Sequence, residues 1–203
     1  MKIFRTSLLV LTMFCASCSQ VPKEEVRSLV PPKEEAPKEF IFPIEKGSER
    51  ITKKTFGLRI SPKNSPVSPE KFSGYHTGVD FEIFEGEEDA DIIIKAICSG
   101  PLLMKKWATG YGGVVAQKCE LDKESVVVVY GHLKLASVQT AINTELKAGD
   151  QLGVLGKGYS VETDKERKHL HLSIHKGAGI NIRGYVSTEG ELSQWFNPLE
   201  LLK

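Results

Sequence analysis

The stretch at residues 168–175 reads KHLHLSIH, and its alternation decides how the fold is built. Successive side chains of an extended strand point to opposite faces, so His169 and His171 share one face with Ser173. The leucines and the isoleucine between them share the other face. The pattern predicts a half-buried strand with an apolar face toward the core and a wet face that carries imidazole nitrogens. We interpret His175, at the end of the strand, as a structural residue.

A second stretch, YHTGVDFEIF at residues 75–84, carries His76 and Asp80. Its apolar and acidic residues alternate, which predicts a strand that begins near Asp80. Four extended residues span about 13 Å, too far for two ligands of one ion that are each bound at about 2 Å. The chain must therefore turn at Thr77 and Gly78 if the two side chains act together, and glycine makes a turn easy to form.

His132 lies in a third segment, VVVVYGHL, and all five histidines of the chain fall in these three segments. A lone histidine or aspartate is usually an ordinary surface or core residue. Imidazoles and a carboxylate gathered in this way are instead the ligands of a catalytic zinc site, which leaves one position to water. The sequence therefore predicts one zinc site with its catalytic groups, formed by His76, Asp80, His132, His169 and His171.

Short apolar runs separated by Gly, Pro, Asn and Asp dominate the chain from residue 40 onward. Seven of them predict strands: VDFEIF, DIIIKAI, PLLMKKW, GGVVAQK, SVVVVY, LGVLG and HLHLSIH. No long helical period is present, and TAINTEL at residues 140–146 is at best a short helix or turn. About 160 residues suffice for one core. We expect a mostly β domain with a single antiparallel β-sheet and the zinc site in a groove on it.

These segments resemble the M23 family of zinc metallopeptidases, the LytM or lysostaphin-like peptidoglycan endopeptidases. The matching landmarks cover residues 40–203 in the family's order: FIFPI, TFGLRISP, HTGVD, ICSGPLL, GYGGVV, VVYGHL, LKAGDQLGVLG, HLH and WFNPLELL. The resemblance implies that zinc is bound by His76, Asp80 and His171. It also implies that His132 and His169 form the catalytic pair, whose separate roles the sequence does not assign.

The resemblance further implies hydrolysis of peptide cross-links or stem peptides of bacterial peptidoglycan by a zinc-bound water that two histidines assist. The alternative is a non-catalytic M23-like module that binds peptidoglycan and activates other cell-wall hydrolases. Retention of all five site residues disfavours this alternative.

The chain departs from the family directly before HLH. Family members commonly have a stretch rich in Ser, Thr, Gly and Pro there, whereas this chain has a charged run from Glu162 to Lys168. We interpret the run as a solvated loop, with contact to substrate as the alternative.

The N-terminus indicates where the domain works. Lys2 and Arg5 precede a short apolar run, so residues 1–18 read as a signal peptide. The tetrapeptide CASC that ends it resembles a bacterial lipobox, which implies that Cys18 carries a lipid anchor to a membrane. Plain secretion is the alternative. With the lipid anchor, the protein is expected in the cell envelope, outside the cytoplasm.

Residues 19–39 repeat Pro, Lys and Glu with few apolar side chains, and we interpret them as a disordered linker to the peptidase domain at 40–203. The formal net charge of the chain is +1, which gives no electrostatic reason to expect nucleic acid as a partner.

Cys98 and Cys119 are the only cysteines after the linker. Outside the cytoplasm they can form a disulfide, or they can remain as two buried thiols. A cysteine peptidase that uses Cys98 is disfavoured, because an activated thiolate needs an exposed, electropositive setting and Cys98 follows an apolar run.

Overall fold

The computed structural model describes residues 40–203. The predicted signal peptide, Cys18 and the linker at residues 19–39 lie outside the described residues. Within the described part, no helix is both long and apolar enough to cross a membrane.

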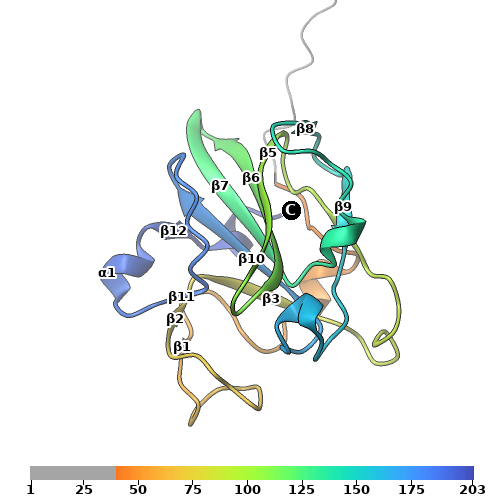
Figure 1. The fold of residues 1–203 in the computed structure, drawn as a ribbon. Coiled ribbons are helices and arrows are strands. Elements are labelled where there is room, and N and C mark those ends of the chain that lie inside the picture. Colours follow the sequence, from red (N-terminus) through yellow and green to blue (C-terminus); the bar gives the residue numbers. More distant parts are fainter. Residues whose placement is uncertain (1–39) are drawn as a thin grey trace, which may run out of the picture. The chain divides into compact units, whose positions relative to one another are not determined.

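The described residues contain twelve strands. Figure 1 shows how they are arranged. In chain order they are β1 (Arg59–Ile60), β2 (Gly74–His76), β3 (Gly78–Glu82), β4 (Ile93–Lys95), β5 (Gly100–Ala108), β6 (Gly112–Leu121), β7 (Glu124–Gly131), β8 (Glu145–Leu146), β9 (Gln151–Val154), β10 (His169–Lys176), β11 (Tyr185–Val186) and β12 (Trp195–Phe196). Within residues 40–203, helical structure is confined to α1 (Glu189–Leu192) and to short 3-10 turns at Gly47–Arg50, Leu135–Ser137, Val161–Thr163 and Pro198–Glu200.

The largest sheet has seven strands, and β10 pairs with three of the others. One side of β10 pairs with β7, while β3 and then β12 pair along its other side, all antiparallel. The sheet continues from β7 through β6 and β5 to β8 (Figure 1). Strands β1, β2 and β11 form a separate three-stranded sheet, and β4 pairs with β9.

The valine run of β7 is buried on both faces of the sheet. Val128 and Tyr130 face the main apolar cluster, whereas Val127 and Val129 face a smaller cluster that includes Tyr111. Because both faces are covered, the strand is continuously apolar and shows no alternation of apolar and polar residues.

All seven predicted strands are present, so the mostly β, antiparallel prediction is confirmed. The sequence did not predict the short strands β1, β2, β8, β11 and β12, and it predicted one sheet where the structure has three. Residues 140–146 form a turn that leads into β8, with no helix.

The wet face predicted for β10 is wrong. His169, His171 and Ser173 are as buried as the leucines between them. The rings of Tyr111 and His76 lie over His171, with centroids 5.4 Å and 4.8 Å from its own. Side chains from β2 and from the turn between β5 and β6 therefore cover the polar face, which alternation within one strand does not reveal.

Cys98 and Cys119 form a disulfide with their Cα atoms 6.0 Å apart. The bond joins β6 to the segment before β5, within the main apolar cluster. A disulfide sulfur has no thiolate, so the cysteine-peptidase alternative is excluded for this form of the protein.

Candidate metal site and cleft

A bend between two sheets brings His76 to Asp80. His76 ends β2 in the three-stranded sheet, the chain bends at Thr77, and β3 then joins the main sheet. His76 Nε2 lies 3.2 Å from Asp80 Oδ1 as a result. The predicted turn is therefore present, although the strand begins at Gly78, two residues earlier than expected.

Glycine is needed at position 78 for a different reason than the turn that the sequence predicted. Its φ is not in the left-handed region. A Cβ at this position would lie 2.2 Å from the carbonyl oxygen of Leu172 and 3.0 Å from His171 Cε1. Glycine is required because β10 passes so close to β3.

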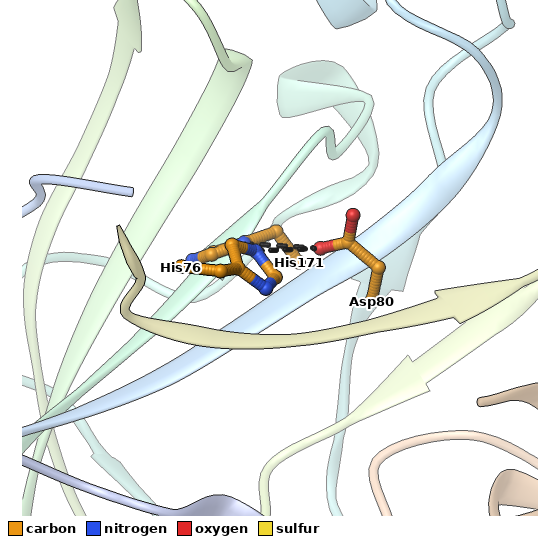
Figure 2. Close-up of side chains that lie close together, drawn as sticks. All are labelled: His76, Asp80 and His171. Carbon is orange, nitrogen blue, oxygen red and sulfur yellow. Dashed lines mark hydrogen bonds and ion pairs between the residues drawn. The ribbon is translucent and has the colours of Figure 1, made fainter. Parts of the chain in front are cut away.

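The register between β3 and β10 supplies the third member of the group, since His171 lies directly opposite Asp80. His171 Nδ1 is 2.9 Å from His76 Nε2 and 3.1 Å from Asp80 Oδ1. Figure 2 shows the Asp80 carboxylate turned toward the two rings. All three side chains are buried, and their ligand atoms lie close enough together to hold one metal ion.

The surroundings of these three groups suit a metal. His76 Nδ1 lies 3.1 Å from the carbonyl oxygen of Thr55, which can only accept, so the Nε2 lone pair is free to face the group. Burial lowers the pKa of His171 to about 4. Burial acts to raise the pKa of the Asp80 carboxyl, but the adjacent His76 and His169 rings hold it well below its usual range. Two neutral imidazoles and a carboxylate are the donor set that divalent zinc takes.

Two further histidines complete the constellation. The ring centroids of His132 and His169 are 4.1 Å apart, and His169 Nε2 lies 3.4 Å from Asp80 Oδ2. His132 directly follows β7 with a left-handed φ of 63°, a conformation uncommon for residues other than glycine. The structure thus brings together all five residues that the sequence singled out.

The environments of these two histidines differ. His169 Nδ1 lies 2.9 Å from the carbonyl oxygen of Arg167, which fixes the proton on Nδ1 and leaves Nε2 with its lone pair when the ring is neutral. Burial lowers the pKa of His132 well below its usual value. Its Nδ1 is buried without a hydrogen-bond partner in the described part of the chain.

A cavity of about 330 Å³ opens at this group. Phe72 and Tyr185, stacked with ring centroids 5.3 Å apart, line it together with Tyr111. Lys54 also lines it, and its ammonium is paired with Glu70 at 2.6 Å. The cleft thus has an aromatic lining and a cation that an internal carboxylate already neutralises.

The charged run before HLH is not a solvated loop at its C-terminal end, which corrects that interpretation. Glu166 and Lys168 are buried, and Arg167 donates to Asp80 Oδ2 at 2.8 Å. Lys168 Nζ donates to three backbone carbonyls. Together with Tyr111, Arg167 is the site residue that the sequence reasoning missed. Tyr111 lies in the GYGGVV landmark, but no local pattern marked Arg167.

His175 lies outside the cavity, as expected of a structural residue. Its ring packs edge-on against Trp195, with centroids 4.9 Å apart, and its Nε2 lies 3.3 Å from Asn181 Nδ2.

The sequence and the fold are similar to those of known proteins. The sequence model of peptidase family M23 matches residues 74–182, more than half of the chain. The structure is similar to that of LytU, with 25% identity, a TM-score of 0.50, and 73% of this chain and 81% of that chain covered. It is also similar to the catalytic domain of the antimicrobial peptidase lysostaphin from Staphylococcus simulans, with 20% identity, a TM-score of 0.49, and 72% and 87% covered.

A chain from the SpoIIQ–SpoIIIAH pore-forming complex has the same fold, with 18% identity, a TM-score of 0.50, and 81% of this chain and 91% of that chain covered. The sequence matches no curated protein significantly. The family match spans both His76 and His171, and with them the whole group of convergent side chains. The chain therefore belongs to peptidase family M23.

Proposed function

We propose that the protein is a zinc-dependent endopeptidase that hydrolyses peptide cross-links or stem peptides of bacterial peptidoglycan. The observation that carries the proposal is the convergence of two histidines and an aspartate within 3.2 Å of one another, beside a second histidine pair in a cleft. Membership of a peptidase family supports the same reaction.

His76, Asp80 and His171 would hold the ion through Nε2, Oδ1 and Nδ1. Held there, the ion would supply Lewis-acid chemistry, which makes a water molecule nucleophilic near neutral pH. The three donors are buried and their ligand atoms lie within 4.8 Å of one another, so they are close enough to bind one ion together.

His169 is the better placed of the remaining pair to accept a proton. The carbonyl oxygen of Arg167 fixes the proton on Nδ1, so Nε2 of the neutral ring carries the lone pair. Nε2 lies 3.4 Å from Asp80 Oδ2, beside the three proposed ligands. Burial keeps His132 neutral at pH 7, so its ring can donate one N–H to the carbonyl oxygen or the leaving amine of the substrate. We assign the two roles on this difference in environment.

The protein is proposed to act in the cell envelope, outside the cytoplasm, and to be held at a membrane by a lipid on Cys18. The substrate polymer is found there. Mass spectrometry of the mature N-terminus tests the anchor: a diacylglyceryl group on Cys18 supports it, and an unmodified N-terminal peptide contradicts it.

Purified peptidoglycan tests the reaction. We expect the wild-type protein to release soluble peptides, release to stop when a chelator removes the metal, and added zinc to restore it. His169→Ala should release none. Binding to peptidoglycan without release, with or without zinc, would contradict the proposal and favour a non-catalytic module instead.

A further inference from the structure

The two carboxylate oxygens of Asp80 have separate partners. Oδ1 lies 3.2 Å from His76 Nε2 and 3.1 Å from His171 Nδ1. Oδ2 accepts a hydrogen bond from Arg167 Nη2 at 2.8 Å. One oxygen therefore faces the metal group, and the arginine holds the other away from it.

Arg167 is itself fixed by a second carboxylate. Its Nε donates to both oxygens of Glu82, at 2.9 Å and 3.1 Å, and its Nη2 reaches Glu82 Oε1 at 2.5 Å. Glu82 lies two residues after Asp80 on β3, so the two carboxylates share one face of the strand. The Arg167 side chain is 11% exposed, and its guanidinium bridges both carboxylates.

Charge alone does not explain an arginine at this position, because a guanidinium beside a metal site repels the incoming cation. Glu82 offsets that charge, so the Arg167–Glu82 pair is close to neutral and the negative charge of Asp80 remains available. What the arginine adds is geometry, since its planar fork binds carboxylates in a defined orientation.

We propose that Arg167 is a positioning residue of the metal site, which orients Asp80 so that Oδ1 alone faces the ion, and that Glu82 anchors the arginine. The inference rests on the proposed zinc site. The backbone carbonyl of Arg167 also holds His169, but substitution of the side chain leaves that contact in place.

Zinc affinity of the purified full chain, measured by competition with a chelator, tests the proposal. We expect Arg167→Gln to weaken zinc binding about 10- to 100-fold, the usual effect of removing a partner of a metal ligand. Arg167→Lys keeps the charge and loses the fork, so most of the loss should remain. The absorption bands of bound Co²⁺ should change in both variants, because the coordination by Asp80 changes.

Lys53→Gln is the matched control. Lys53 Nζ lies 3.5 Å from Glu82 Oε2, and no contact joins it to Asp80 among the described residues. Its removal takes away a cation beside the same carboxylate, and we expect unchanged zinc affinity and an unchanged Co²⁺ spectrum.

The double variant Arg167→Gln/Glu82→Gln removes both members of the Arg167–Glu82 pair, so that Glu82 is not left as a buried charge without its arginine if Arg167→Gln alone fails to fold. It should bind zinc as weakly as Arg167→Gln alone. Recovery of wild-type affinity in the double variant, or equal or tighter binding by Arg167→Gln, would overturn the positioning role. Absence of zinc binding by the wild type would overturn the proposed function itself, and the inference with it.

Discussion

Replacing Gly78 with alanine tests whether the spacing of β3 and β10 sets the metal site. The new Cβ would lie 2.2 Å from the carbonyl oxygen of Leu172, where an ordinary contact is at least 3.4 Å. The two strands would have to separate by about 1 Å, a strain of the size that overpacking produces. We expect a loss of about 3 kcal/mol in the free energy of unfolding, which combines that strain with weakened ladder hydrogen bonds. For a domain of this size the melting temperature should fall by about 6–12 °C.

The same displacement moves Asp80 relative to His171, which lies opposite it in the ladder. Zinc is bound at about 2 Å, so a shift of about 1 Å should weaken its binding by at least about tenfold. The assays are thermal unfolding of the metal-free protein and zinc competition at a temperature where both proteins are folded.

Gly179→Ala is the control, because a Cβ there meets nothing within 4 Å and its φ is not left-handed. Its stability should change by no more than about 1 kcal/mol. If Gly78→Ala melts within a degree of the wild type and binds zinc equally well, the close approach of β3 and β10 does not require glycine at position 78.

Three other predictions follow from the site and the core. His171→Ala should lose both bound zinc and peptide release, whereas His132→Ala should keep the zinc and lose release; equal zinc content by elemental analysis would refute the division of roles. Because the pKa of His171 is about 4 in the folded protein and about 6.5 when unfolded, the unfolded chain binds the extra proton between these values. The metal-free protein should therefore lose about 3 kcal/mol of stability as the pH falls from 7.5 to 4.5, measured by urea unfolding, and a flat profile would contradict the burial of a neutral ring. Tyr130→Phe should cost about 2 kcal/mol in the same assay, since the buried hydroxyl accepts from Ile97 N and donates to Gln117 Oε1, each at 2.9 Å.

The strand pattern was readable from the sequence because it is local. Alternation in HLHLSIH placed His169 and His171 on one face, and the distance argument for HTGVD required the bend that the structure has at Thr77. Both inferences used residues within a few positions of each other. The fold class and the five candidate site residues were predicted from such local patterns together with the resemblance.

The role of Arg167 could not be read in the same way. Its partners Asp80 and Glu82 lie 87 and 85 positions away in the chain, and they meet it only because β10 pairs with β3. A run of mixed charges usually indicates solvent exposure, and nothing in its own sequence distinguishes the buried members. Pairing between distant strands also explains why the burial of His171 under Tyr111 was not predicted.

Two glycines explain how a histidine ring fits into the buried face of β10. Gly131 lies directly opposite His171 on β7, and a Cβ there would lie 2.4 Å from the ring of Tyr111 and 3.3 Å from His171 Cβ. On the other side, a Cβ at Gly78 would lie 3.0 Å from His171 Cε1. The His171 ring thus uses the space left open at Gly78, and the Tyr111 ring that packs against it uses the space left open at Gly131. The register of β3, β10 and β7 therefore places His171 opposite Asp80, whereas His76 completes the proposed metal site from β2 of the three-stranded sheet.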